Sequence, residues 1–364
     1  MSKRIRIAIA GIGNCASALV QGIAYYKRTG ATAGLSHVSL GGYAVGDIDV
    51  VAAFDIDARK VGRPVREAIF AVPNNTTVFE ASVPSDAIVR MGPVLDGVAG
   101  HMSDYPESMR FVVSSAAAVD VAGELRDTKA EVLVSYMPVG SRRATEFYAH
   151  AAMTAGVSLV NCMPEFIVSD NQWARRFTAA GIACVGDDVK SQLGATVTHR
   201  TLTRLFADRG LPVQTSYQLN VGGNTDFLNM LDRSRLTSKK TSKTQAVQSQ
   251  LKTPMEDERL HVGPSDFVPF LKDKKVCFLR MEGEGFGGSK VELELRLSAE
   301  DSPNSAGMVV DAIRACALAR EYGRAGPLIE ACAWTMKHPP VQMRDSDALA
   351  ALDEWVKGLE RRKA

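Results

Sequence analysis

Basic residues are concentrated in one segment near the middle of the chain, and they could hold an anion. Residues 219–244 read LNVGGNTDFLNMLDRSRLTSKKTSKT and contain Arg233, Arg235, Lys239, Lys240 and Lys243. A helix starting here, with Ser238 and Ser242 as caps, would place Lys239 and Lys243 four residues apart on one face. Two cations on one face repel each other unless an anion lies between them. The segment predicts a phosphate site, with a solvated charged loop as the alternative.

Three other segments carry polar residues that could join this site. GDDVKSQLGAT places Asp187 and Asp188 at the end of a predicted strand, where open α/β sheets bind ligands, and Ser191 and Gln192 at a helix start suited to phosphate. GFGGSK presents Lys290 beside a glycine loop, and WTMKHPP puts Lys337 at the end of a helix. Gly222, Gly223 and Asn224 could add further donors. Each segment also has a purely structural interpretation: a helix cap, a hairpin turn and a favourable helix-dipole charge.

A glycine motif near the N-terminus indicates a dinucleotide site. Gly11, Gly13 and Ala16 have the spacing of the G-x-G-x-x-G/A fingerprint, after a predicted strand and at the start of a predicted helix. The first glycine permits a tight turn, the second lets a pyrophosphate approach the backbone, and the small third residue lets the helix pack closely. The helix N-terminus would then bind the pyrophosphate. An ordinary strand–helix turn is the alternative.

The acidic partner of this motif is predicted at Asp55, where the strand VVAAF ends. A carboxylate at this position bonds the adenosine ribose and disfavours a 2′-phosphate, so the cofactor is predicted to be NAD and not NADP. Asp55 lies farther from the glycines than the usual ~20 residues. We interpret the glycine-rich stretch 30–46 as an inserted loop, with a surface helix cap as the alternative role for Asp55.

Composition points to an ordinary globular protein. The chain has 364 residues, 46% hydrophobic and 23% charged, enough for two modest domains, and its formal charge of +2 gives no general attraction for nucleic acid or an anionic membrane. The N-terminus lacks the features of a signal peptide, and no apolar run reaches the ~20 residues of a membrane span. The six cysteines and six histidines are scattered, which disfavours a zinc site. We therefore expect a cytoplasmic protein with reduced thiols.

The elements that position these residues are predicted to form two units. Up to about Asp188, short β-branched runs alternate with helical patterns, the signature of βαβ units in a doubly wound parallel sheet. The predicted strands are Ile5–Ala10, Val50–Phe54, Phe111–Val113, Val132–Tyr136, Ser158–Asn161 and Ala183–Gly186, and the predicted helices are Ala16–Tyr26, Val121–Leu125, Arg143–Ala152 and Gln172–Ala180.

After Asp188 the pattern changes to α+β. Val291, Leu293 and Leu295 alternate with charged residues, which indicates a strand with one buried face, joined through glycines to the strand before it. The helical period returns from Asn304. We therefore predict an α/β Rossmann-type domain over 1–190, an inserted α+β domain over 191–303, and C-terminal helices over 304–364 that pack back on the first domain.

Together, GDDVKSQLGAT, NVGGNTD leading to SKKTSK, GGSK followed by EDSPNSAGMVVD, and the late WTMK resemble myo-inositol-1-phosphate synthase in its short prokaryotic form. The likeness covers nearly the whole chain. It implies an NAD-containing Rossmann domain, an inserted catalytic and tetramerisation domain over 191–303 whose sheet helps form a homotetramer, and conversion of D-glucose 6-phosphate to an inositol phosphate. The chain departs from the family pattern at GIGNCAS, which replaces a longer Gly/Asn-rich loop, and at SQLGAT, which replaces a tighter SGQT.

The resemblance also implies roles for individual residues. The implied catalytic set is Lys239, Lys243, Lys290, Lys337, Asp188 and Asp311. The implied phosphate contacts are Ser191, Gln192, Asn224 and Lys243. The cofactor set extends the glycine motif and comprises Gly11, Gly13, Asn14, Cys15, Ala16, Asp55, Ser135 and Asp187. The family also implies a monovalent or divalent cation near the phosphates, which Asp226 could help to hold.

The implied reaction is redox-neutral: C5 is oxidised, the C6 hydrogens become acidic, the enolate closes on the C1 aldehyde, and hydride returns. Packed lysines suit it, because crowding leaves one amine neutral as a base while its neighbours stay cationic. We expect Lys239 and Lys337 at the reacting carbons, Lys243 and Lys290 divided between phosphate and oxyanion, and Asp188 and Asp311 orienting lysines. The alternatives are a conventional NAD-dependent sugar-phosphate dehydrogenase and, less favoured because no DNA-binding module is evident, a non-catalytic NAD-sensing regulator.

Overall fold

The larger sheet has seven strands joined by parallel ladders, in the order β13-β8-β7-β6-β1-β4-β5. The computed structural model describes residues 3–251 and 253–361. The strands of this sheet are β1 (Ile5–Ala10), β4 (Ile48–Asp55), β5 (Val89–Met91), β6 (Val132–Ser135), β7 (Ser158–Asn161), β8 (Ala183–Val185) and β13 (Gly326–Pro327). Without β13, the order is that of a doubly wound Rossmann sheet, which reverses between β1 and β6. The predicted α/β fold class is confirmed.

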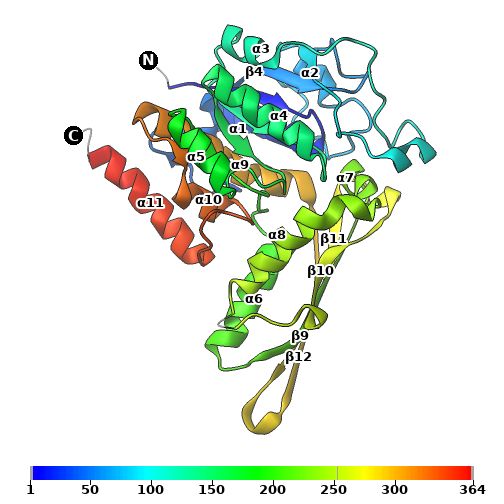
Figure 1. Cartoon of the computed structure of the whole chain (residues 1–364), viewed down its shortest axis with the longest axis vertical. Coiled ribbons are helices and arrows are strands. Elements are labelled where there is room, and N and C mark those ends of the chain that lie inside the picture. Colours follow the sequence, from blue (N-terminus) through cyan, green and yellow to red (C-terminus); the bar gives the residue numbers. More distant parts are fainter. Residues whose placement is uncertain (1–2, 252, 362–364) are drawn as a thin grey trace.

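Helices cover the apolar faces of this sheet (Figure 1). They are α1 (Asn14–Thr29), α2 (Val65–Ala68), α3 (Val121–Asp127), α4 (Arg142–Ala155), α5 (Asn171–Ala179), α9 (Asp301–Glu321), α10 (Ile329–Thr335) and α11 (Asp345–Arg361). Helix α9 packs against α1 and against β6, β7 and β8. It is buried on nearly every side, as expected of a helix in the middle of a layered core.

Most of the strands expected in this part of the chain are present within a residue or two of their predicted bounds. One prediction is wrong: Phe111–Val113 is not a strand of the sheet, and Val113 makes only an isolated bridge with Asp57. The edge strand is β5, only three residues long and with one exposed residue in its middle. Such a short edge strand lacks the apolar run that marks the buried strands.

The second sheet has four strands in the order β10-β9-β11-β12. Strands β9 (Val213–Gly222) and β10 (Leu260–Phe267) are parallel, whereas β11 (Lys274–Glu284) and β12 (Lys290–Glu300) form an antiparallel hairpin. Helices α6 (Ala195–Asp208) and α8 (Thr237–Gln248) pack against it. The predicted alternation is confirmed, since Leu293 and Leu295 join the apolar cluster that contains Leu279 and Met281.

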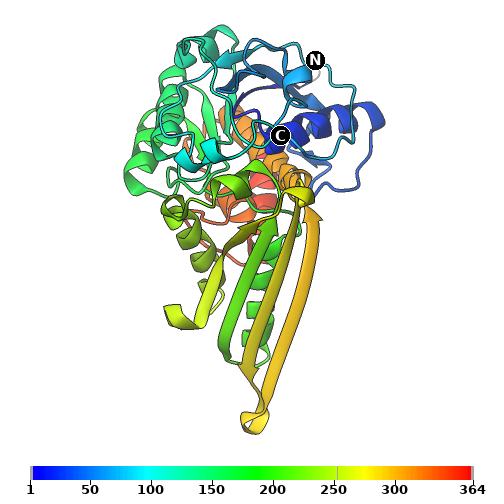
Figure 2. The same cartoon turned by 90° about the vertical axis from the view of Figure 1, so that its right-hand side faces the viewer.

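The two sheets meet near the start of α9, and the hairpin extends from there to the far end of the molecule (Figure 2). Residues 213–300 supply every strand of the smaller sheet, whereas α9, β13, α10 and α11 return to the larger one. In the described residues, no helix has the length and apolar character to cross a membrane.

Candidate functional site

A pocket lies between the carboxyl edge of the seven-stranded sheet and the elements of the second sheet. It is lined by the start of α1, the loops after β6, β7 and β8, the first turn of α6, and residues of β9, α8, β11, α9 and α7 (Thr225–Asn229). This is the switch point where open α/β sheets bind ligands. The predicted residues that line it are Gly13, Asn14, Cys15, Asp188, Ser191, Asn224, Asp226, Lys239, Lys243 and Lys337.

The glycine turn has the geometry that its sequence predicts. Gly11 has a φ of +90°, and a Cβ there would lie 2.5 Å from the Tyr136 carbonyl oxygen, so no other residue fits without strain. A Cβ on Gly13 would meet nothing within 4 Å, which leaves open space above the helix N-terminus. Asp55 accepts a hydrogen bond from the Ile12 amide at 2.7 Å and therefore lies beside the turn, although it does not line the pocket itself.

Asp273 joins the glycine turn to the second sheet. Its Oδ1 accepts from the Asn14 side chain at 3.4 Å, from Asn224 at 3.0 Å and from the Ser302 hydroxyl at 2.9 Å, while Oδ2 accepts from Thr76 at 2.7 Å. Burial, and then repulsion from Asp301, raise its pKa to about 6. Sequence reasoning missed this residue because an isolated aspartate in a charged loop carries no signal of its partners.

The SK-x-x-SK segment places its two lysines on one face of a helix, as predicted. Lys239 donates to Asp226 Oδ2 at 2.8 Å, and both Lys239 and Lys243 are buried pocket residues of α8. The predicted caps are wrong: α8 begins at Thr237, so Ser238 and Ser242 both lie inside it. The Ser242 hydroxyl donates to Asp188 Oδ2 at 2.7 Å instead.

Asp188 links the strand edge to a second lysine of the pocket. Its Oδ1 accepts from Lys337 Nζ at 2.9 Å, and the side chain of Asp188 is 5% exposed. Lys337 lies two residues beyond the last residue of α10, close to the predicted helix end. Burial opposes the charge of this carboxyl, but attraction to Lys337 and Lys239 outweighs it and lowers its pKa. Asp188 is therefore an anion that holds a cation in place.

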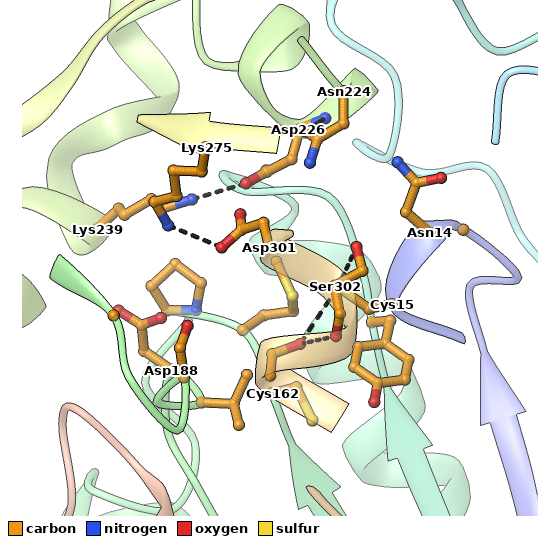
Figure 3. A pocket seen from close by; sticks show the side chains of 18 of the residues that line it. Asn14, Cys15, Cys162, Asp188, Asn224, Asp226, Lys239, Lys275, Asp301 and Ser302 are labelled. Atoms are coloured by element: carbon orange, nitrogen blue, oxygen red, sulfur yellow. Dashed lines mark hydrogen bonds and ion pairs between the residues drawn. The ribbon is translucent and has the colours of Figure 1, made fainter. Parts of the chain in front are cut away.

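Lys275 and Asp301 form a third lysine–aspartate pair, which sequence reasoning missed. Lys275 Nζ donates to Asp301 Oδ1 at 3.0 Å, and Figure 3 shows this pair beside the pair of Lys239 and Asp226. Burial opposes both charges, but the mutual attraction raises the pKa of Lys275 and lowers that of Asp301. Asp301 is the second residue of EDSPNSAGMVVD. The sequence motifs include this segment, but the residue selected from it as catalytic is its last aspartate, Asp311.

Lys243 has no carboxylate of its own among these pairs. In the described part of the chain its amine donates no hydrogen bond, and it lies among three other ammonium groups. Burial, and then repulsion from Lys239, Lys275 and Lys337, lower its pKa well below the ordinary value. Four lysines thus face three aspartates, and one of the four amines is held toward its neutral form.

Two predicted catalytic residues lie outside the pocket. Lys290 is the first residue of β12, is exposed, and lies at the tip of the hairpin, where it pairs with Glu284. Asp311 is fully buried in α9, where it accepts from His37 at 2.7 Å and from the Trp334 indole at 3.1 Å, and contacts Arg314. Lys275 and Asp301, which the sequence analysis did not select, line the pocket.

Other predicted contacts are also displaced. Gln192 donates to the Gly34 carbonyl of the inserted loop and does not line the pocket, and α6 begins only at Ala195, so neither Ser191 nor Gln192 opens a helix. Asp187 accepts from Asn161 and from three loop amides, so it is bound within the protein. Ala16 and Ser135 are buried behind the pocket wall.

The expected metal residue has one free oxygen. Asp226 Oδ1 is buried without a hydrogen-bond partner, while Oδ2 is engaged by Lys239. In residues 3–251 and 253–361, no group of three His, Cys, Asp or Glu side chains is arranged to hold a metal ion. A cation at Asp226 would therefore need oxygen ligands from outside these side chains, such as water or a bound phosphate.

Fold and site together define a Rossmann-type α/β protein with an added sheet and a buried lysine–aspartate pocket. Residues 194–302 match the family model described as myo-inositol-1-phosphate synthase. The chain is 51% identical over 360 residues to inositol-3-phosphate synthase of Mycobacterium tuberculosis (98% of this chain, 97% of the relative). It is 50% identical over 361 residues to that of Corynebacterium glutamicum (97% and 98%).

A solved structure shares the same fold: a myo-inositol-1-phosphate synthase-related protein from Thermotoga maritima, with a TM-score of 0.83 and 23% identity, covering 97% of this chain and 98% of that one. The chain belongs to the myo-inositol-1-phosphate synthase family, as the resemblance in its sequence predicts.

Proposed function

We propose that the protein converts D-glucose 6-phosphate to 1D-myo-inositol 3-phosphate in an NAD-dependent reaction without net redox change. The observation that carries this proposal is the convergence of Lys239, Lys243, Lys275 and Lys337 on one pocket with the glycine turn. Inositol-3-phosphate synthases at 50% identity and more over nearly the whole chain support the choice of reaction.

The residues of the first domain fit a dinucleotide. Space above Gly13, the amide groups of the first turn of α1, and the carboxylate of Asp55 beside the turn are the features that such a cofactor needs. Bound NAD would take hydride from C5 of the sugar and return it later. We therefore assign the cofactor site to Gly11, Gly13, Asn14 and Cys15 with Asp55, and we leave Asp187 and Ser135 as supports of the fold.

The lysines divide into a base and a set of cations. Lys243 is the proposed base, because its lowered pKa favours the neutral amine, whose lone pair can accept a proton, more than in an ordinary lysine. Lys239, Lys275 and Lys337 form ion pairs with Asp226, Asp301 and Asp188, and we assign them to stabilise the phosphate and the oxygens that become negative at C5 and C1. These roles replace those expected for Lys290 and Asp311.

The pocket also supports some of the expected phosphate contacts. Ser191 lines it, and Asn224 caps α7 through its oxygen, which fixes the amide beside the lysines. We retain both as proposed phosphate contacts together with a lysine, and we exclude Gln192. No step of the proposed reaction depends on a metal ion.

We further propose the predicted division of the chain and a homotetramer. Residues 1–190 and 304–364 would form the cofactor domain and residues 191–303 the inserted domain. The outer face of the smaller sheet exposes Tyr217 and Phe278, which supports a contact between copies there. Light scattering of the purified protein tests the assembly.

The activity is tested by incubating the protein with glucose 6-phosphate and NAD while inositol phosphate and NADH absorbance are followed together. We expect inositol phosphate to accumulate without NADH. NADH rising in step with product would instead identify a dehydrogenase. Lys239→Ala and Lys337→Ala should each abolish turnover while the protein remains folded and still binds NAD, and near-normal activity would remove that lysine from the catalytic set.

The base is tested by pH. An amine must lose its proton to act as a base, so kcat should rise with pH through the lowered pKa of Lys243 and level off above it. Lys243→Arg keeps a cation that cannot deprotonate, and should lose about 10³-fold in kcat at every pH. A Lys243→Arg enzyme that keeps the wild-type pH profile would assign the base to another residue.

A further inference from the structure

We propose that Arg200 and Gln342 are positioning residues for Lys337, acting from outside the pocket through the backbone of the segment that carries this lysine. The inference rests on the proposed function, in which Lys337 is one of the reacting cations. A reacting group must be held accurately, and Lys337 lies outside any helix.

Lys337 lies between two helices and belongs to neither. Helix α10 ends at Thr335 and α11 begins at Asp345, so the ammonium group depends on a non-helical stretch whose first residues, 335–338, pair with the backbone of residues 187–190. The Lys337 amide donates to the Asp188 carbonyl at 2.6 Å, and its side chain donates to the Asp188 carboxylate at 2.9 Å. These contacts fix the pocket side of the residue and leave its carbonyl to be held from elsewhere.

Gln342 holds that carbonyl. Its Nε2 donates to the Lys337 carbonyl oxygen at 2.8 Å, which closes the segment into a compact loop. Its Oε1 accepts from Arg200 NH1 at 3.0 Å, and Arg200 NH2 donates to the Met343 carbonyl at 2.6 Å. The amide of Gln342 thus transmits the position of Arg200 to the backbone of Lys337.

Arg200 is a rigid anchor for this contact. It is 0% exposed and lies in α6, the helix whose first-turn residues Ala195 and Thr196 line the pocket. Its Nε lies 3.5 Å from Asp345 Oδ2, and the other oxygen of Asp345 accepts from Lys190 at 2.7 Å. Because burying a guanidinium is costly without such partners, the cluster keeps α6, α11 and the Lys337 segment in one arrangement.

Through Arg200 and Gln342, α6 and the segment that carries Lys337 are joined outside the pocket lining. Helix α6 belongs to the inserted unit and Lys337 to the C-terminal one. A movement of one unit relative to the other would therefore change the position of the Lys337 side chain. A misplacement of about 1 Å at a reacting group can cost on the order of 10²-fold in rate. The proposed role is therefore one of orientation and not of proton transfer.

Gln342→Glu is the sharpest test, because it alters only one end of the contact. The carboxylate still accepts from Arg200, in a charge-assisted bond, but it has no donor for the Lys337 carbonyl. We expect an unchanged melting temperature, an unchanged Kd for NAD, and a loss of about tenfold or more in kcat with KM for glucose 6-phosphate changed less than threefold.

Val341→Glu is the matched control, because it adds the same charge to the same segment at a side chain that is 45% exposed and outside the contact. It should keep the wild-type kcat. Gln342→Met removes both ends of the contact and should lower kcat at least as far as Gln342→Glu. In a Lys337→Met background, Gln342→Glu should not further weaken the binding of glucitol 6-phosphate, which lacks the C1 aldehyde and cannot cyclise.

The outcomes separate the two proposals. Full kcat in Gln342→Glu, with Lys337→Met inactive, overturns the positioning role and leaves the proposed function intact. A kcat loss accompanied by a lower melting temperature and weaker NAD binding also overturns it, because that pattern reflects general damage to the fold. Full activity in Lys337→Met overturns instead the role proposed for Lys337 itself.

Discussion

The two ends of the β11–β12 hairpin have different surroundings, although each end carries a lysine. Lys275 lies at the root, beside the start of α9, and Lys290 lies at the tip, beside a glycine loop. At the root, Lys275 is paired with Asp301 inside the pocket. At the tip, Lys290 is exposed and follows a glycine loop in which Phe286 is fully exposed as well. Nine residue steps of β11 separate Lys275 from Glu284, the strand partner of Lys290, which corresponds to roughly 30 Å.

The difference shows that a lysine near a glycine loop is not thereby a phosphate residue. A lysine on β11 or β12 can reach the pocket only from the end of the strand that faces the seven-stranded sheet. The structure decides this through Asp273, which accepts from Asn14 beside the glycine turn and from Ser302 of α9 and so fixes the root of the hairpin, whereas the tip lies far from the larger sheet (Figure 2).

The largest expected effect contrasts the two lysines. Lys275→Ala removes a partly buried cation from the reacting region and leaves Asp301 unpaired, so kcat should fall by about 10³-fold. Lys290→Ala should keep kcat within about twofold, because surface substitutions away from a site change little. Steady-state kinetics of both variants decide it, and equal losses in the two would place the tip in the active site of a neighbouring copy.

The second comparison concerns the two ends of α9. Asp301→Asn should lower kcat by about 10²-fold and leave the melting temperature nearly unchanged, because its partner Lys275 stays beside the pocket. Asp311→Asn leaves the buried Arg314 without its counter-charge and should cost about 3 kcal/mol of stability with little change in kcat per folded molecule. Denaturant melts and kinetics on both variants measure this, and the reverse pattern would restore Asp311 to the site.

Much of the fold was predictable from the sequence, because strands such as β1 and β7 are buried apolar runs and α1 follows a fingerprint with a defined geometry. Site residues were predictable where they lie on one helix, because a spacing of four residues puts Lys239 and Lys243 on the same face. Lys275, Asp273 and Asp301 were not predictable, because their partners lie in other elements. Asp311 lies ten residues beyond Asp301 in the same helix. The sequence therefore indicated the right segment, but the aspartate selected from it does not line the pocket.

The glycine turn allows a finer contrast within the first domain. Gly11→Ala places a Cβ against the Tyr136 carbonyl at positive φ and should cost about 2 kcal/mol of stability. Gly13→Ala meets no protein atom, so the melting temperature should stay the same while the Kd for NAD rises about tenfold or more. Calorimetry with and without NAD separates the two, and normal NAD affinity in Gly13→Ala would remove the turn from the cofactor site.

The smallest expected effect concerns the inserted loop. His37 bridges Asp311 and Asp353, and the hydrogen bond that it donates to the Asp311 carboxylate raises its pKa above the ordinary value. The stabilisation is complete below the unfolded value of about 6.5 and is lost as pH rises through the raised folded value. His37→Gln should therefore lose about 1 kcal/mol at pH 6 and less at pH 9. A deficit that grows with pH would show that His37 is neutral in the fold.

The central claim is that the pocket lysines and the cofactor act together on one sugar phosphate without releasing an intermediate. It is tested most directly with glucose 6-phosphate deuterated at C5 and unlabelled NAD. Hydride taken from C5 and returned within the same complex predicts inositol phosphate that retains the deuterium, with no labelled NADH in solution. Product that has lost the deuterium to the free cofactor pool would contradict the account.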